Sequence, residues 1–244
     1  MRGLVLAAGA GRRLGALGAD RPKCLVEVGG RTLLDWQHAA LTGAGIHDLA
    51  IVSGYRAEQL PQRGWTRFHN PRFADTGVIA SLMTARDWLE VDDCIVSYAD
   101  IVYGPETIAA LQDTPGDIAM TSYSQWRALW EARFADPLTD AETFRTDARG
   151  QLLEIGQRAT SLDEIQGQFM GLVKFTPAGF SLAAKHVTAL GTGADRLDMT
   201  SLLRGLIEQG VPVQTRTVDG FWYEVDNSDD AAFFPEWAAR QHFS

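Results

Sequence analysis

Long apolar runs and cysteines are scarce in this chain. No stretch of its 244 residues approaches the roughly 18 consecutive apolar residues of a membrane-spanning helix. The apolar run near the amino terminus is too short for the core of a signal peptide. We therefore expect a cytoplasmic protein with no membrane partner. The two cysteines, Cys24 and Cys94, follow no metal-ligand spacing and do not indicate a disulfide framework.

Basic residues are also in the minority. Lys and Arg total 22 against 31 Asp and Glu, a formal net charge of −9. Proteins that bind nucleic acids usually carry a basic surface, so this balance argues against a nucleic-acid partner. Lysine is the rarest charged type, because only Lys23, Lys174 and Lys185 occur. Each lysine is therefore a candidate for a specific role.

The pattern of apolar residues indicates an α/β fold. Short strand-like runs alternate with helical patterns, which predicts a mostly parallel mixed sheet with helices on both faces, a Rossmann-like three-layer α/β/α sandwich. A Thr-Asp pair at Thr32 and Asp35 resembles a helix capping box. Strands are predicted at 2–7, 48–53, 65–69, 94–98, 117–122 and 169–175, and helices from 32 and at 81–89, 106–112, 177–190, 200–209 and 229–241.

One segment breaks this alternation. Residues 123–166 are polar, aromatic and rich in turn residues, which indicates an insertion over one edge of the sheet. We interpret it as part of the same domain rather than as a separate one, and we predict one domain over residues 1–244.

The first strand leads into a loop with glycines at Gly9, Gly11, Gly15 and Gly18, closed by Lys23. Glycines let backbone N–H groups approach an anion, and nearby cations neutralise it. The spacing matches neither a dinucleotide GxGxxG nor a P-loop. We interpret the loop as an open phosphate cradle in which Lys23 and either Arg12 or Arg13 reach the phosphates. A purely structural loop is the alternative.

Two carboxylates follow strand-like runs. Asp100 comes after the run 94–98, where open α/β sheets place their ligand crevice, and Asp226 lies in an acidic turn before the last helix. Together they are candidate Mg²⁺ ligands. Turn formation or helix capping would explain either residue alone.

The insertion carries Trp126 and Trp130, four residues apart and hence on one face of a helix. They either pack beneath the insertion or face a substrate ammonium group through a cation–π contact. Lys174, inside an apolar strand, is either an edge lysine or a cation aimed at a substrate phosphonate. We favour the second role for Lys174.

These residues together resemble a known family. Leu6–Leu25 is similar to the signature LAAGxGxRxxxxxxxxPKxL of sugar-phosphate-type nucleotidyltransferases, and residues 70–82, 95–103 and 224–226 resemble its cytidylyltransferases. Residues 125–130 resemble a double-Trp insertion of phosphocholine and phosphonate cytidylyltransferases, and 163–177 resemble the phosphonate branch. Gly77 departs from the family, whose members often carry Asn there.

The resemblance implies a Mg²⁺-dependent transfer of CMP from CTP to a small phosphonate or phosphate, with 2-aminoethylphosphonate as the expected acceptor and pyrophosphate as the leaving group. It implies a catalytic Lys23, selects Arg13 over Arg12, and makes Asp100 and Asp226 the metal ligands. The remaining expected contacts are with nucleotide at Ala7, Ala8, Gly9, Ala10, Gly11, Ser81 and Asp100, and with acceptor at Trp126, Trp130 and Lys174.

Other functions were compared with this one. Phosphocholine or a sugar 1-phosphate could be the acceptor, and a catalytically silent nucleotide sensor could share the fold. An NAD-dependent oxidoreductase is disfavoured, because Glu27 and Asp35 do not follow a strand at the spacing expected for a ribose-binding acid. Related enzymes are often dimeric, so a homodimer is one of the partners that the resemblance implies.

Overall fold

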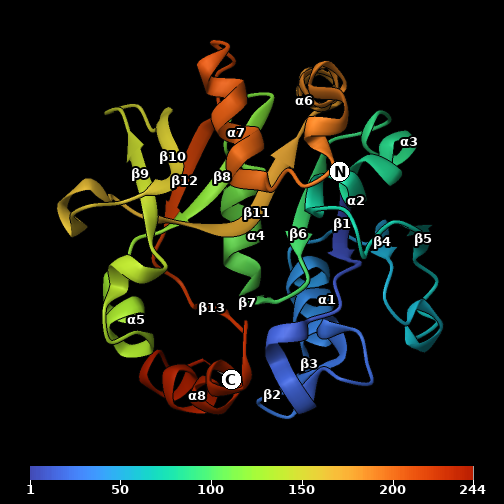
Figure 1. The fold of residues 1–244 in the computed structure, drawn as a ribbon, viewed down its shortest axis with the longest axis vertical. Helices are drawn as coiled ribbons and strands as arrows, with labels where there is room; N and C mark the ends of the chain where they lie inside the picture. Colours follow the sequence, from blue (N-terminus) through green and yellow to red (C-terminus); the bar gives the residue numbers. More distant parts are fainter. Residues whose placement is uncertain (244) are drawn as a thin grey trace.

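A seven-stranded sheet forms the centre of the protein (Figure 1), in a computed structural model that describes residues 1–243. The strand order is β12-β8-β11-β6-β1-β4-β5. Only β11 runs antiparallel to its neighbours within this sheet. The predicted mostly parallel mixed sheet is therefore confirmed. Its strands are β1 (Arg2–Ala7), β4 (Leu49–Ser53), β5 (Thr66–His69), β6 (Cys94–Tyr98), β8 (Ile118–Tyr123), β11 (Gln168–Phe175) and β12 (Gln214–Val218).

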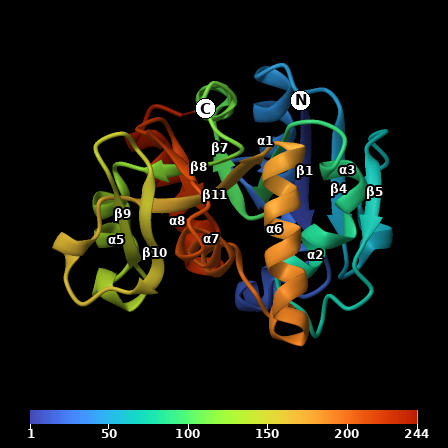
Figure 2. The same cartoon turned by 90° about the horizontal axis from the view of Figure 1, so that it is seen from above.

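Helices cover both faces of the sheet (Figure 2). Helices α1 and α4 pack together on one face, and α2, α6 and α7 pack on the other. The α-helices are α1 (Leu33–Gly43), α2 (Val78–Thr84), α3 (Arg86–Leu89), α4 (Pro105–Gln112), α5 (Trp126–Arg133), α6 (Pro177–Leu190), α7 (Met199–Glu208) and α8 (Ser228–Arg240). Short 3-10 helices occupy η1 (Arg12–Leu17), η2 (Lys23–Leu25), η3 (Ala57–Gln59), η4 (Pro137–Thr139), η5 (Leu162–Glu164) and η6 (Gly191–Ala194).

Local sequence explains most element boundaries. The Thr32 hydroxyl accepts the N–H of Asp35, and the Asp35 carboxylate accepts the N–H of Thr32, so the predicted capping box starts α1. The single helix predicted at 81–89 is wrong. Helix α2 begins at Val78, and the chain leaves helical geometry at Ala85, which separates α2 from α3.

The insertion is more ordered than its polar sequence indicates. It folds into α5, η4 and a hairpin of β9 (Glu142–Thr146) with β10 (Leu152–Arg158), which packs on α7. Figure 1 shows this unit beside the β12–β8 edge of the sheet. Elsewhere, β7 (Ile101–Tyr103) pairs with β13 (Trp222–Glu224), and β2 (Glu27–Val28) pairs with β3 (Arg31–Thr32).

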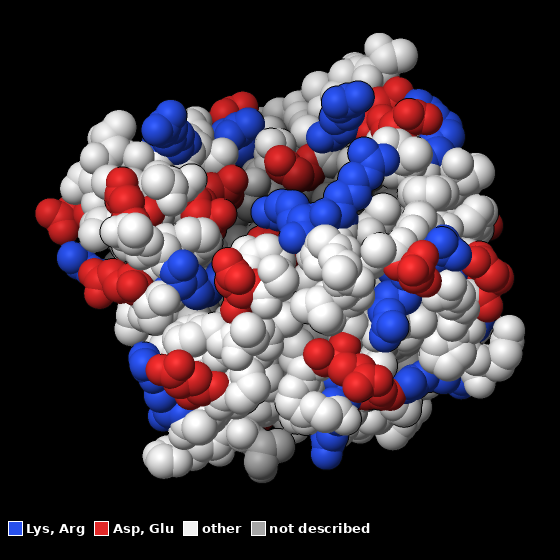
Figure 3. Space-filling model, turned by 60° about the horizontal axis from the view of Figure 1, so that its bottom comes forward, with Lys and Arg blue, Asp and Glu red and all other residues white. Residues whose placement is uncertain are grey.

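The surface carries charges of both signs. On the face in Figure 3, Lys and Arg side chains lie among Asp and Glu side chains rather than forming one continuous basic patch. No helix within residues 1–243 combines the length and the apolar character needed to cross a membrane.

Candidate active site

The loop after β1 brings a lysine between two carboxylates. The Nζ of Lys23 donates to Oδ2 of Asp100 at 2.7 Å and to Oδ1 of Asp226 at 2.9 Å. The guanidinium of Arg13 donates to the same Asp226 oxygen at 2.9 Å, although its side chain is 71% exposed. Four residues expected to act together therefore meet at one point, from segments up to 213 positions apart.

These residues come together because β1 and β6 end side by side and because β13 pairs with β7. Asp100 follows β6, which lies beside β1 in the sheet, and the glycine loop follows β1. Strand β13 pairs with β7 in the register Glu224 to Ile101, and the N–H of Val225 donates to the Asp100 carbonyl at 2.9 Å. This pairing sets Asp226 beside Asp100.

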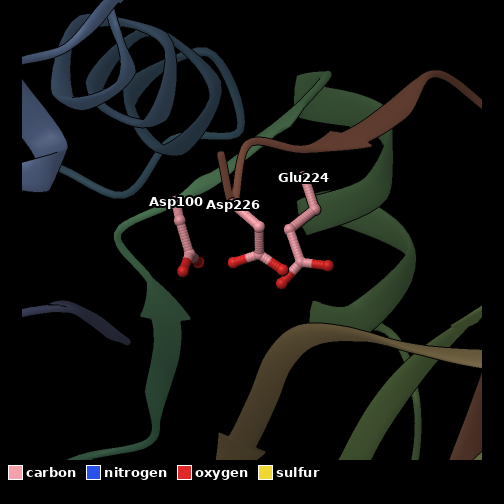
Figure 4. A group of neighbouring side chains, drawn as sticks. All are labelled: Asp100, Glu224 and Asp226. Atoms are coloured by element: carbon pink, nitrogen blue, oxygen red, sulfur yellow. The ribbon is translucent and has the colours of Figure 1, made fainter. Parts of the chain in front are cut away.

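A third carboxylate, Glu224, points into the same space (Figure 4). Asp100, Glu224 and Asp226 each offer an oxygen within 4.8 Å of the others. Burial, together with the charges of Asp226 and Asp100, raises the pKa of Glu224 well above its usual range. Sequence reasoning gave Glu224 no role, although a strand places residues two apart on the same side and Glu224 lies two residues before Asp226.

The charges of the cluster act on one another. Burial lowers the pKa of Lys23, but the charges of Asp100 and Asp226 outweigh it and leave this pKa above its ordinary value. Burial raises the pKa of Asp226, but the Lys23 ammonium outweighs it and the net shift is downward. Both groups are therefore charged near neutral pH.

The donor set fits a divalent cation. Carboxylate oxygens are hard ligands of the kind that Mg²⁺ prefers. Oδ1 of Asp100 is buried and has no hydrogen-bond partner among the described residues, so an electron pair there is available to a ligand. A metal ion would be held by Asp100 and Asp226, with Glu224 beside them.

One cavity lies beside the cluster, and a second lies along the glycine loop. The first has a volume of about 200 Å³ and reaches Asp100 and Lys23. The second has a volume of about 500 Å³, and Phe73 lines both cavities. The predicted nucleotide contacts are divided between the cavities: Ala7, Ala8, Gly9, Ser81 and Asp100 line the first, and Ala10, Gly11 and the alternative cation Arg12 line the second.

The wall near Ser81 is built from a small hydrogen-bond network. The amide of Asn70 donates to the hydroxyls of Ser81 and Thr76, both at 3.0 Å. A hydroxyl that accepts from Asn70 keeps its own proton for another partner. Ser81 lines the first cavity, where it can present that proton to an acceptor atom of a base.

Steric contact explains why this chain has Gly77 where members of the family often carry Asn. A Cβ at this position would lie 2.7 Å from the carbonyl oxygen of Leu197 and 2.9 Å from the carbonyl carbon of Arg196. The N–H of Gly77 also donates to the Asp195 carbonyl at 2.6 Å. The segment before α7 therefore packs on this turn too closely for any side chain.

The two tryptophans lie inside the insertion rather than on a binding surface. Trp126 is 4% exposed and Trp130 is 3% exposed. Trp130 stacks on Trp222 at 6.0 Å between ring centroids, and its Nε1 donates to Asp140. The packing alternative for these residues therefore matches the geometry, because neither ring offers an open face to an incoming ammonium group.

The structure does not bring Lys174 to the site, so its assignment to acceptor binding is corrected. Its ammonium donates to the carbonyls of Gln112 and Thr114, at the carboxyl-terminal end of α4. Lys174 pairs in register with Ile95, near the start of β6, whereas Asp100 follows the end of that strand. Burial lowers the pKa of Lys174. Its role is to satisfy a helix end.

Residues that sequence reasoning did not assign complete the first cavity. They come from the segment around the start of α2, from the glycine-loop region and from the end of β6, and the resemblance of these segments to the family was the available signal. They are Leu6, Cys24, Phe73, Thr76, Gly77, Val78, Tyr98 and Ala99.

Comparison with known proteins gives a consistent result. Residues 3–164 match the MobA-like NTP transferase domain. The chain is 32% identical over 249 residues to a CTP:phosphoglutamine cytidylyltransferase of Campylobacter jejuni, covering 94% of this chain and 97% of the relative. It is 28% identical over 159 residues to a 2-aminoethylphosphonate cytidylyltransferase of Lancefieldella rimae, covering 63% and 60%. The structure of an inositol-1-phosphate CTP transferase from T. maritima superposes with a TM-score of 0.73 at 18% identity, covering 97% and 96%.

Proposed function

Because the chain belongs to the MobA-like NTP transferase family, we propose that it transfers CMP from CTP to a small phosphonate or phosphate and releases pyrophosphate. The chain is a nucleotidyltransferase; the specific reaction is our proposal. The observation that carries it is the contact of Lys23 with Asp100 and Asp226 beside two cavities. A nucleotide sensor would not require this arrangement of a cation and a metal-binding cluster.

In the proposed reaction, an acceptor oxygen forms a bond to the α-phosphorus of CTP while the bond to the pyrophosphate oxygen breaks. The acceptor oxygen is already negatively charged at neutral pH, so no general base is needed. Such reactions depend mainly on positioning and charge neutralisation. Asp100 and Asp226 would hold a Mg²⁺ ion, which would supply part of that neutralisation.

The protein's own cations supply the rest. We propose that Lys23 stabilises charge on the α-phosphate and that Arg13 faces the departing pyrophosphate. Arg13 can turn toward the pyrophosphate, because 71% of its side chain is exposed and, among the described residues, it pairs with one carboxylate, that of Asp226. The backbone of Ala7 to Gly11 would contact the nucleotide, with Ser81 near the base.

Two acceptors are our candidates. The resemblance of residues 163–177 and the similarity to the L. rimae enzyme favour 2-aminoethylphosphonate. The similarity to the C. jejuni enzyme is higher and extends over nearly the whole chain, which favours phosphoglutamine. Both carry an amino group and a charged phosphorus oxygen.

The test is a ³¹P NMR assay of the purified protein with CTP and Mg²⁺, with 2-aminoethylphosphonate, phosphoglutamine or phosphocholine in separate samples. A new CMP anhydride of the acceptor together with pyrophosphate identifies the acceptor. Turnover with phosphocholine alone would transfer the assignment to the choline branch. CTP binding without turnover in any sample would count against all three acceptors and would favour another acceptor or a nucleotide sensor.

A further inference from the structure

The aromatic cluster of the insertion holds a cation of the chain itself. Arg133, the last residue of α5, has a side chain only 2% exposed. Its guanidinium lies 5.0 to 5.8 Å from the ring centroids of Phe134, Trp130 and Tyr223. Contacts in this range are attractive cation–π interactions. The sequence analysis considered a cation–π contact between Trp130 and a substrate ammonium group. In the structure, the guanidinium of Arg133 makes that contact.

This guanidinium connects the insertion to the carboxylate cluster by a short hydrogen-bonded path. Its Nε donates to Oδ1 of Asp230 at 2.9 Å. The other oxygen of Asp230 accepts the N–H of Asp226 at 2.9 Å and that of Asn227 at 3.1 Å. Arg133 therefore holds the carboxylate that fixes the backbone of Asp226.

A second contact reaches Glu224. The Nη1 of Arg133 lies 3.9 Å from Oε2 of Glu224. This Nη1 is buried and has no hydrogen-bond partner among the described residues. A buried guanidinium is costly unless it is paired. The positive charge of Arg133 beside Glu224 offsets the electrostatic repulsion between Glu224 and the carboxylates of Asp226 and Asp100.

We propose that Arg133 is a positioning residue, which orients Asp226 through Asp230 and Glu224 through its Nη1. It does not touch the substrates. This inference rests on the proposed function, because the cluster matters as a metal site only if the protein transfers a nucleotide. It assigns the insertion a role in ordering the cluster.

The test measures Mn²⁺ binding by electron paramagnetic resonance in the presence of CTP, on the full chain and without acceptor. Loss of a group that orients metal ligands typically weakens metal affinity by about 10- to 100-fold. We expect a loss in that range for Arg133→Met and a smaller loss for Arg133→Lys, which keeps the charge but not the planar fork. The matched control is Arg127→Met on the same helix, because Arg127 is exposed and, within residues 1–243, pairs only with Glu131.

Mn²⁺ affinities within twofold of the wild type in both Arg133 variants, at a temperature where both are folded, would overturn the proposal. If Arg133→Met does not fold, Arg133→Lys decides alone. A wild-type protein that binds CTP but no Mn²⁺ would refute the metal site and this inference together. A wild type that binds Mn²⁺ but turns over no acceptor would count only against the proposed reaction.

Discussion

At the scale of single residues, the position of Lys23 gives the sharpest prediction. Its ammonium is held by two carboxylates at 2.7 and 2.9 Å. In the proposed reaction this contact fixes the ammonium where charge develops. Loss of a preorganised donor typically lowers kcat by about 10²- to 10³-fold. We expect Lys23→Ala to lose activity in that range with an unchanged fold. Steady-state kinetics with the acceptor identified by NMR measures this.

The control for that measurement is Lys185→Ala, because Lys185 is exposed on α6. The control should keep wild-type kcat. A Lys23→Ala enzyme with normal kcat would remove Lys23 from the mechanism.

Gly77 gives a second prediction at this scale. A methyl group there would press on the backbone of Leu197 and Arg196. Such overpacking typically costs about 1–3 kcal/mol of stability. Because Gly77 also lines the first cavity, Gly77→Ala should weaken CTP binding as well as stability. Urea unfolding and isothermal titration calorimetry measure the two effects.

Gly193 is the matched position. A Cβ there meets no atom within 4 Å, and its φ is not in the left-handed region. Gly193→Ala should change neither quantity. Equal CTP affinities in the two variants would show that the turn at Gly77 does not shape the nucleotide site.

Single residues were also where sequence reasoning was least secure. Lys174 looked like a substrate ligand because a lysine in an apolar strand needs a partner. Its partners are main-chain carbonyls about 60 positions earlier, at the end of α4. No sequence pattern marks a helix end as the acceptor of a distant lysine. Asp100, by contrast, was predictable because the end of a parallel strand is a recurrent ligand position.

At the scale of elements, two helix starts can be compared directly. Helix α1 begins with a capping box at Thr32 and Asp35, and α8 begins with one at Asn227 and Asp230. Replacing a capping side chain with alanine typically costs about 1 kcal/mol. Thr32→Ala and Asn227→Ala should therefore lose similar stability in urea unfolding.

Thr32→Ala and Asn227→Ala should differ in their effect on activity. Asn227 follows Asp226 directly, and its cap holds the first turn that contains Asp230. Asn227→Ala should thus raise the Mg²⁺ concentration needed for half-maximal activity, whereas Thr32→Ala should not. A shift of equal size in both variants would attribute the effect to stability rather than to the cluster.

The strands show how far the sequence alone predicts individual elements. Strands β1 and β6 were predictable because both are apolar and short. The pairing of β7 with β13 was not, since three-residue strands 120 positions apart carry no register signal. That register sets Glu224 and Asp226 beside Asp100. Asp100 and Asp226 could therefore be named from the sequence, whereas Glu224 and the arrangement of the three carboxylates could not. The β9–β10 hairpin was missed for a related reason: polar strands look like loops.

At the scale of the whole molecule, the two cysteines can report whether residues 1–244 unfold as one unit. Cys24 borders the first cavity and Cys94 starts β6, at the opposite end of that strand from Asp100. Both side chains are buried, at 1% and 0% exposure. Burial raises the pKa of Cys24 to about 12 and also raises that of Cys94. Neither thiol should react before the protein opens.

We therefore expect Ellman's reagent to label both thiols at one slow rate near pH 8, set by the free energy of unfolding when refolding outpaces labelling. A ligand that binds only the folded state slows such labelling by a factor of one plus the ratio of ligand concentration to Kd, about 100-fold at 100 times Kd. CTP should thus protect Cys94, remote from the cavity, as strongly as Cys24. The single-thiol variants Cys24→Ser and Cys94→Ser assign the rates. Faster labelling of Cys24, or CTP protection confined to it, would show that the glycine loop opens locally while the sheet stays folded, since only a cooperative transition couples the two positions.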